Sequence, residues 1–222
     1  MKKVLIVATH KKYKMPKYSC YLPLHVGKKG KNELGYIGDD TGNNISEKNP
    51  YYCELTGIYW AWKNLEADYI GLVHYRRYFG KKINKNIPFE NIFSDIEIDE
   101  LLKISDVILP KKRKYFIETL YSHYKNTMYI EPLDEAGKII LEKCPEYSMY
   151  FRKLYKRRSA HMFNMFIMKK EYFNKYCEWL FPILEELEKR IDHTKYDSFH
   201  ARFYGRISEL LLDIWIEKNK IK

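Results

Sequence analysis

The stretch Asp68–Phe79 constrains the fold more than any other part of this chain. Residues 69–73, YIGLV, form a short run of β-branched and aromatic residues typical of a buried strand, with a glycine where another backbone can approach closely. The run stops at His74, and Arg76 and Arg77 follow. Ligands of α/β proteins gather at the carboxyl ends of strands, and arginine matches phosphate oxygens bidentately. The stretch therefore predicts an anion-binding strand end, with a solvated basic strand end as the alternative.

The residues before this strand predict an α/β fold. Residues 3–9 predict a first strand, and residues 13–34, which are basic and contain proline and glycine, predict a loop. Residues 51–65 predict a helix that starts after Pro50, because apolar residues recur on one face at helical spacing. A strand, a loop, a helix and a second strand in this order are typical of a mostly parallel central sheet flanked by helices.

The rest of the chain continues the alternation of helices and strands. We expect a surface loop over residues 80–99, a strand over residues 106–110, and helices over residues 98–104, 116–124, 133–144 and 147–157. An apolar strand over residues 158–168 contains His161 and Asn164, and two amphipathic helices follow, over residues 170–192 and from near residue 205. With 222 residues, of which 45% are hydrophobic, the chain can bury a core as one domain.

Charge and composition narrow the class of partner. The net charge of +11 favours a polyanionic partner such as nucleic acid, anionic lipid or a phosphorylated substrate. The four cysteines form no C-x-x-C pair, so neither a zinc knuckle nor a disulfide framework is indicated. No apolar run approaches the roughly 20 residues that span a bilayer, and the apolar part of the N-terminus is too short for a signal peptide. We therefore expect a cytoplasmic protein.

Further candidate ligands stand at the end of the first strand and in a glycine-rich loop. His10 and Lys11 follow the first strand, where a nucleotide would be met. Asp39 and Asp40 lie in the loop 35–50, where they can coordinate a metal, accept hydrogen bonds from a ribose or base, or cap turns. The sequence contains no Walker loop, G-x-G-x-x-G, G-x-S-x-G or H-E-x-x-H motif. These absences argue against a P-loop kinase, a Rossmann dehydrogenase, an α/β-hydrolase and a zincin.

Several motifs occur together in an order that is specific. They are ATHK at 8–11, DDTGNNI at 39–45, YCELT at 52–56, YWAWKN at 59–64, HYRRYF at 74–79 and HMFNMF at 161–166. On these motifs the chain resembles, over residues 3–216, a bacterial family of capsular and exopolysaccharide biosynthesis proteins long described as a domain of unknown function. That family is regarded as a family of glycosyltransferases with GT-A-like folds, and some members are linked to galactofuranose transfer.

The resemblance implies a single GT-A-like domain over residues 1–222. Its nucleotide-binding half would span about residues 1–110 and its acceptor half about residues 111–222. It also implies a hexosyltransferase that moves a sugar, galactofuranose among the candidates, from a UDP-sugar onto a growing capsular, exopolysaccharide or other surface-glycan acceptor. The alternatives are a basic nucleic-acid-binding module and a non-catalytic subunit of polysaccharide assembly.

The chain departs from the GT-A pattern at its central strand. GT-A enzymes usually carry Asp-x-Asp there to hold Mn²⁺ or Mg²⁺ on the diphosphate, whereas this strand ends in His74-Tyr75-Arg76. Our hypothesis is that His74, Arg76 and Arg77 stabilise the leaving diphosphate directly, since fixed donors aimed at developing charge are often the largest catalytic effect. The enzyme would then need no metal cofactor. In the alternative, Asp39 and Asp40 hold Mn²⁺ or Mg²⁺.

The resemblance also suggests roles for the donor-side residues. His10 and Lys11 would meet the nucleotide, and Asp39 and Asp40 would contact the uracil or ribose. Glu54 would bond the ribose or the donor sugar, or would instead be an acid favoured by the dipole of its helix.

On the acceptor side, His161 and Asn164 would face the sugar and the acceptor. An inverting transferase needs a base for the acceptor hydroxyl, and His161, Asp197 and Glu209 are all candidates. The sequence does not choose among them, and it leaves inverting and retaining chemistry open.

The partners follow from the same resemblance. Capsular acceptors are commonly carried on a lipid diphosphate at the inner membrane face. The basic runs Lys111–Lys114 and Lys156–Arg158 would dock there on anionic lipid, or form a solvated basic face. We expect no nucleic-acid partner, because no recognised nucleic-acid motif is present and the basic residues are scattered. The oligomeric state is left open.

Overall fold

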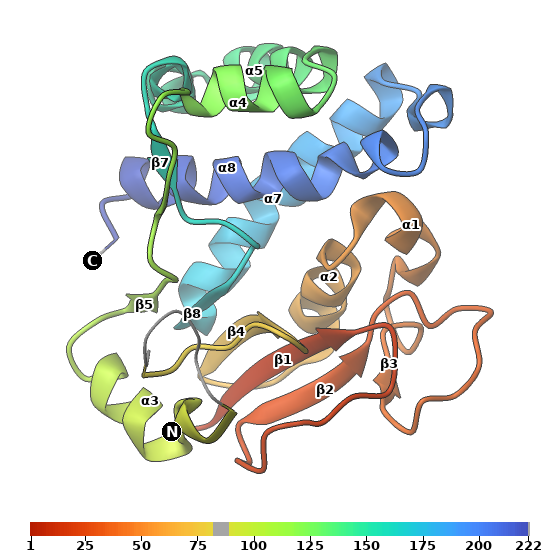
Figure 1. The fold of residues 1–222 in the computed structure, drawn as a ribbon, viewed down its shortest axis with the longest axis vertical. Helices are drawn as coiled ribbons and strands as arrows, with labels where there is room; N and C mark the ends of the chain where they lie inside the picture. The colour runs from red at the N-terminus through yellow and green to blue at the C-terminus, as the bar shows by residue number, and fades with distance from the viewer. Residues whose placement is uncertain (82–88, 222) are drawn as a thin grey trace.

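The computed structural model describes residues 1–81 and 89–221, and its centre is a six-stranded sheet (Figure 1). The strand order is β3-β2-β1-β4-β8-β5. The strands are β1 Lys3–Thr9, β2 Tyr21–His25, β3 Ile37–Gly38, β4 Tyr69–His74, β5 Val107–Ile108 and β8 Phe166–Lys169. The first four in chain order are parallel, and β8 is antiparallel to both β4 and β5. The predicted mostly parallel sheet is confirmed.

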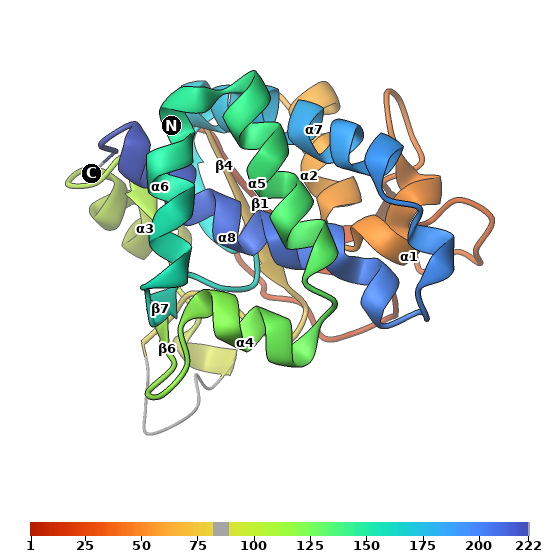
Figure 2. The same cartoon turned by 90° about the horizontal axis from the view of Figure 1, so that it is seen from above.

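Helices cover the sheet and extend beyond it (Figures 1 and 2). They are α1 Asn49–Tyr52, α2 Leu55–Asn64, α3 Asp95–Leu102, α4 Leu120–Thr127, α5 Glu131–Lys143, α6 Ser148–Arg152, α7 Lys170–Arg190 and α8 Phe203–Lys218. Short 3₁₀ helices occur at Ser46–Lys48, Phe89–Asn91, Pro145–Tyr147, Lys153–Tyr155, His193–Lys195 and His200–Arg202. A separate antiparallel ribbon pairs β6, Arg113–Lys114, with β7, Ser159–Ala160.

The alternation of side chains along β1 builds a core on both faces of the sheet. Ile6 and Ala8 belong to the larger cluster, which contains the apolar faces of α2, α7 and α8. Leu5 and Val7 point to the other face and join a smaller cluster with α3. This is the period of two expected for a strand buried on both sides.

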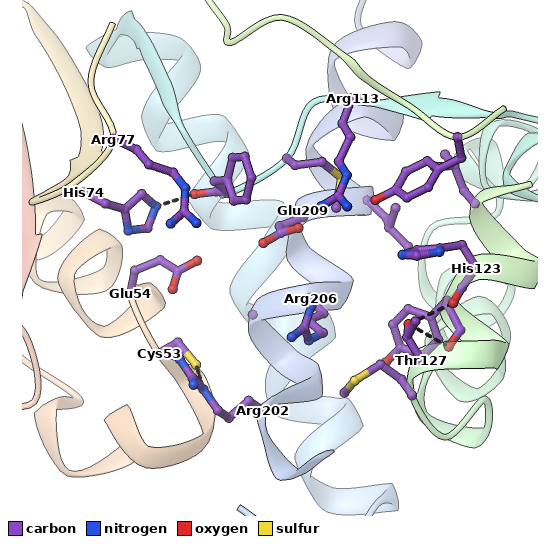
Figure 3. A pocket seen from close by; sticks show the side chains of 18 residues that line it. Cys53, Glu54, His74, Arg77, Arg113, His123, Thr127, Arg202, Arg206 and Glu209 are labelled. Carbon is purple, nitrogen blue, oxygen red and sulfur yellow. Dashed lines mark hydrogen bonds between the residues drawn. The ribbon is translucent and has the colours of Figure 1, made fainter. Parts of the chain in front are cut away.

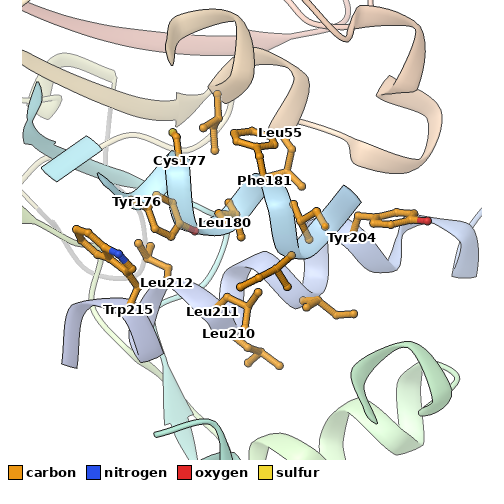
Figure 4. Close-up of a cluster of buried hydrophobic side chains, with 14 of the residues drawn as sticks. Leu55, Tyr176, Cys177, Leu180, Phe181, Tyr204, Leu210, Leu211, Leu212 and Trp215 are labelled. Atoms are coloured by element: carbon orange, nitrogen blue, oxygen red, sulfur yellow. The ribbon is translucent and has the colours of Figure 1, made fainter. Parts of the chain in front are cut away.

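The long C-terminal helices link the sheet to the rest of the molecule. Helix α7 packs against β4 and α2 as well as against α5 and α8. Figure 4 shows aromatic and aliphatic side chains of α7, such as Phe181, meeting those of α8, such as Leu211 and Trp215. Among the described residues, no helix combines the length and apolar character needed to cross a bilayer.

Two predicted elements differ near the N-terminus. The predicted loop 13–34 contains β2, in spite of Pro23. The Val26 N–H donates to the Thr9 carbonyl of β1. Because backbone groups alternate sides along a strand, the ring nitrogen of Pro23 faces away from β1, toward the side of β3. Strand β3 pairs with β2 only from Leu24 onward. The predicted helix 51–65 is interrupted at Cys53, whose φ of 55° is left-handed.

Differences in the second half have similar local causes. The helix predicted over residues 116–124 begins only at Leu120, where Thr119 forms a capping box with Ser122. The strand predicted over residues 158–168 is split into β7 and β8 by a turn in which Phe163 and Asn164 are left-handed. The predicted loop over residues 80–99 lies partly outside the described residues, and its described part contains α3.

Candidate active site

A pocket of ≈ 380 Å³ opens between the carboxyl end of β4, helix α8 and helix α4. Its carboxyl, guanidinium and imidazole side chains are those of Glu54, His74, Arg77, Arg113, His123, Arg202, Arg206 and Glu209. Figure 3 shows α8 along the middle of the pocket, with Glu54, His74 and Arg77 on one side and Arg113 and His123 on the other. The pocket therefore joins the two predicted halves of the chain.

The turn after β4 places two of the predicted residues in the pocket wall. The backbone N–H groups of His74 and Arg77 each donate to the other residue's carbonyl, at 3.0 and 2.9 Å. His74 Nε2 donates to the Phe163 carbonyl at 2.7 Å, because a carbonyl only accepts, and Nδ1 remains free to face a ligand when the ring is neutral. The Arg77 guanidinium lies 4.4 Å from the centre of the Phe163 ring. Phe163 thus positions both basic side chains.

A hydrogen bond from Asn164 fixes the position of the Glu54 carboxylate. The Asn164 side-chain nitrogen donates to Glu54 Oε1 at 2.7 Å and to the Gly205 carbonyl at 3.0 Å, while Ser208 Oγ donates to Asn164 Oδ1 at 2.9 Å. Asn164 is only 1% exposed and does not line the pocket. The structure therefore places the Asn164 amide against Glu54 and not in the pocket lining, where the predicted contact with the acceptor would be made.

Glu209 faces the pocket from α8. Burial, and next the nearby carboxylate of Glu54, raise the pKa of Glu209 to about 8, against the opposing effects of the Phe163 backbone N–H, Arg206 and Arg77. The pocket thus contains two carboxyl groups, one of which holds a proton at neutral pH. Two carboxyl groups in different protonation states are a common arrangement for acid–base chemistry.

Four arginines give the pocket its positive character: Arg77, Arg113, Arg202 and Arg206. Within residues 1–81 and 89–221, none of them forms an ion pair with a carboxylate at salt-bridge distance. Arg202 instead donates from Nε to Cys53 Sγ at 3.0 Å. Burial raises the pKa of the Cys53 thiol to about 11, so this acceptor is neutral. The guanidinium charges therefore remain available to an anion.

A second basic cluster lies at the ends of β1 and β4, around the ring of Tyr75. The His10 ring centre is 5.4 Å from that of Tyr75, Lys11 Nζ is 5.5 Å from it, and the Arg76 guanidinium is 5.0 Å from it. Burial lowers the pKa of His10, and the charges of Lys11, Lys31, Arg76 and Arg202 lower it further. The structure thus brings the predicted residues His10, Lys11 and Arg76 together outside the pocket lining. They lie close enough to the pocket for the charge of the pocket residue Arg202 to lower the pKa of His10.

The predicted loop acids Asp39 and Asp40 lie outside the pocket lining. Asp39 is fully buried and accepts hydrogen bonds from the backbone N–H groups of Gly27 and Lys28 and from the hydroxyls of Ser46 and Thr56, at 2.5–3.0 Å. Four donors therefore occupy both carboxylate oxygens of Asp39, which does not line the pocket. Asp40 is half-buried and does not line the pocket. No cluster of three or more potential metal ligands occurs in the described part of the chain.

Of the three predicted base candidates, only Glu209 lines the pocket. His161 is bonded through Nδ1 to Asp213, whose other oxygen accepts from the His161 backbone N–H at 3.1 Å. Asp197 accepts from the imidazole of His200 at 2.5 Å in an exposed loop. Neither His161 nor Asp197 lines the pocket, so the structure does not bring these two candidates together with Glu209.

Sequence reasoning missed half of the pocket's charged lining: Arg113, His123, Arg202 and Arg206. A partial signal was present, because Arg202 and Arg206 are four residues apart at the start of the last helix and therefore share a face. Arg113 and His123 carry no such signal, because only tertiary packing brings β6 and α4 opposite β4.

Fold and pocket define the chain as an α/β domain with a cationic, carboxylate-bearing cleft at the carboxyl edge of its sheet. It belongs to the family described as Domain of unknown function (DUF4422), whose model matches residues 3–220. This confirms the resemblance noted from the sequence motifs. No match was found among curated proteins.

A solved structure shares the fold. It is the apo structure of WbbM, titled a bifunctional glycosyltransferase, with 35% sequence identity and a TM-score of 0.91. The match covers 99% of this chain and 43% of the WbbM chain, so this chain spans less than half of the length of that relative.

Proposed function

We propose that this chain is a glycosyltransferase that moves a sugar from a nucleotide diphosphate donor onto a surface-glycan acceptor. The observation that carries the proposal is the pocket itself, where four arginines without carboxylate partners among the described residues surround the carboxyl pair Glu54 and Glu209. The likeness to part of WbbM supports the same class. A non-catalytic subunit would fit a closed site, whereas this pocket is open.

The donor would lie across the two basic clusters. His10, Lys11 and Arg76 would contact the nucleoside end, and Arg77 and Arg202 would bind the diphosphate. Charge grows on the diphosphate as its bond to the sugar breaks, and fixed guanidinium groups stabilise that charge without rearranging. We propose that these groups replace a metal ion. Asp39, one of the two residues of the metal alternative, has its oxygens engaged by the chain.

Glu209 is the proposed base in a single displacement. The acceptor O–H proton passes to the Glu209 carboxylate, the acceptor oxygen bonds to the anomeric carbon, and the bond from that carbon to the diphosphate breaks with its electron pair on the leaving group. The raised pKa of Glu209 makes its carboxylate a stronger proton acceptor than an ordinary glutamate. Glu54, fixed by Asn164, would orient the sugar hydroxyls.

The finer assignments are part of the proposal. UDP as the nucleotide, galactofuranose as the sugar, a lipid-linked capsular acceptor and a place at the cytoplasmic membrane face all come from the family resemblance. The four arginines and the carboxyl pair of the pocket support a diphosphate leaving group and a hydroxylated acceptor.

Calorimetric titration with UDP tests the donor site. We expect binding in EDTA that Mn²⁺ does not strengthen, and a loss of roughly tenfold or more in Arg77→Ala and Arg202→Ala, as for hydrogen bonds to charged groups. Arg152→Ala is the matched control, because Arg152 is exposed and lies outside this pocket. Binding that needs Mn²⁺ would reject the arginine mechanism. If UDP and UDP-sugars bind under neither condition, the proposed UDP-sugar donor is wrong.

A further inference from the structure

An apolar tip protrudes between β6 and α4. Phe116 and Ile117 are adjacent in sequence and are 86% and 88% exposed, more than any other large hydrophobic residue in the described part of the chain. Exposed apolar side chains are ordinary when isolated, but a contiguous pair this exposed marks a surface that meets another apolar phase.

The tip is held in place by the backbone on both sides. The Tyr115 N–H donates to the Arg158 carbonyl and the Leu120 N–H donates to the Arg157 carbonyl, both at 2.7 Å. Arg158 also donates from its guanidinium to the Phe116 carbonyl at 3.5 Å. These contacts fix the segment at each end, so the exposure of Phe116 and Ile117 is a built feature of the fold.

Cations lie beside the tip on the β6–β7 ribbon. The β6–β7 ribbon pairs Arg113 with Ala160 and Lys114 with Ser159, and so brings the two basic runs of the sequence side by side. The exposed members are Lys111, Lys112, Arg113, Lys114, Lys156 and Arg158. Over the described ranges, 1–81 and 89–221, none of these six forms an ion pair. Arg157 differs, because it pairs with Glu217.

We infer that this surface docks the protein on an anionic phospholipid membrane, with Phe116 and Ile117 inserted among the lipids and the five cations other than the pocket residue Arg113 on the headgroups. An apolar tip flanked by unpaired cations is complementary to a bilayer, which presents negative charge over hydrocarbon. Single-stranded nucleic acid would instead call for stacked aromatic rings along a groove, and Ile117 offers no stacking face.

Docking in this orientation would bring the pocket to the membrane. Arg113 and Tyr115 precede the tip, Leu120 and His123 follow it, and all four line the pocket. Figure 2 shows β6, β7 and α4 together at one side of the molecule. This step rests on the proposed function: an acceptor anchored in the same bilayer would then meet Glu209 without leaving the surface.

Vesicle co-sedimentation tests the inference on the full chain without any sugar donor. Vesicles of phosphatidylcholine alone are compared with vesicles that also contain phosphatidylglycerol. We expect binding only to the anionic vesicles, weakening with salt because the Debye length shortens. The variant Phe116→Ser with Ile117→Ser should bind about tenfold more weakly or worse. The variant Lys111→Gln, Lys112→Gln, Lys114→Gln should lose about a hundredfold, at about fivefold for each lysine.

Matched variants elsewhere control for general hydrophobicity and charge. Ile96→Ser with Ile104→Ser removes two isoleucines that are 73% and 84% exposed on and after α3. Lys2→Gln, Lys17→Gln, Lys220→Gln removes three exposed lysines remote in sequence from the tip. We expect both controls to bind anionic vesicles like the wild type. Insertion is read directly in Phe116→Trp, whose fluorescence should be quenched by brominated lipid.

Three outcomes would overturn the inference. In the first, the protein binds neutral and anionic vesicles equally. In the second, the tip variant binds vesicles as tightly as the wild type. In the third, light scattering shows that the protein needs the tip to self-associate, although it does not need the tip to bind vesicles. Transfer to a water-soluble acceptor should be unchanged in the tip variant, since neither Phe116 nor Ile117 lines the pocket. A wild type that binds vesicles but transfers no sugar would reject the proposed function and leave the membrane surface standing.

Discussion

Asn164 donates a 2.7 Å hydrogen bond to Glu54 across 110 residues of sequence. The amide is itself fixed by the Gly205 carbonyl and by Ser208, both of α8. Glu54 directly precedes α2, whereas Asn164 lies just before β8 and is itself held by α8. The geometry of the pocket therefore depends on α8 remaining packed at this end of the sheet.

This contact predicts strong coupling between Asn164 and Glu54. Asn164→Ala should lower the transfer rate about tenfold or more, and should reduce the free energy of unfolding by about 1–3 kcal/mol because it leaves buried partners unsatisfied. A double-mutant cycle separates the two effects. If Asn164 acts through Glu54, adding Asn164→Ala to Glu54→Gln should cost little further activity. Fully additive losses in activity would contradict the positioning role.

The raised pKa of Glu209 predicts the pH dependence of transfer. A base must be deprotonated, so kcat should rise with pH and level off above about 8. Glu209→Gln should be slower by about 10²–10⁴-fold and lose this rise. Glu54→Gln removes a neighbouring negative charge, so the rise in its remaining activity should move to lower pH. A wild-type rate that is already constant from pH 6 upward would exclude Glu209 as the base.

The same group predicts a pH dependence of stability that needs no substrate. The folded chain keeps a proton on Glu209 up to pH about 8, whereas the unfolded chain loses it near the ordinary value of 4.5. Stability is therefore lost as pH rises through this window, since the folded state binds the extra proton. Glu209→Gln cannot ionise at this position. The melting temperature of the variant minus that of the wild type should therefore increase from pH 5 to pH 8. The exposed Glu146→Gln serves as control, and a parallel gain there would refute the assignment.

The sequence predicted the parts of the fold that follow strong local patterns. The strands β1 and β4 are continuous apolar runs, and the helices α7 and α8 have apolar residues at helical spacing. The short strand β2 was missed because Pro23 argued against a strand. Pairing with β1 does not need an N–H at Pro23, because the nitrogen of this residue faces away from β1. The residues around Pro23 in the sequence could not show which adjacent strand the proline nitrogen faces.

The site was predictable on one wall and not on the other. His74, Arg77 and Glu54 adjoin predicted elements at the edge of the sheet, where ligands are expected. Asn164 was assigned to the acceptor side because the resemblance to GT-A enzymes places a strand there. In the structure Phe163 and Asn164 instead form a left-handed turn, and the Asn164 side chain is buried. Asparagine tolerates this conformation, but tolerance alone does not predict it.

Gly71 links the fold to the pocket and gives a final prediction. A Cβ at this position would lie 2.8 Å from the carbonyl oxygen of Phe166 in the paired strand β8, and a backbone atom cannot move aside like the end of a side chain. Gly71→Ala should therefore reduce the free energy of unfolding by about 1–3 kcal/mol, the usual range for overpacking. Displacing β8 would also move Phe163, and with it the partner of His74.

Chemical denaturation measures the first effect, and UDP affinity measures the second. Gly205→Ala is the comparison for stability, because its Cβ would meet Cys53 Cβ at an ordinary 3.5 Å inside α8, where alanine is favoured over glycine by up to about 1 kcal/mol. We expect Gly205→Ala to unfold at the same or a higher denaturant concentration than the wild type, and Gly71→Ala at a lower one with weaker UDP binding. A Gly71→Ala protein of wild-type stability would show that β8 can move away from β4 without cost, and the close approach would then have no structural importance.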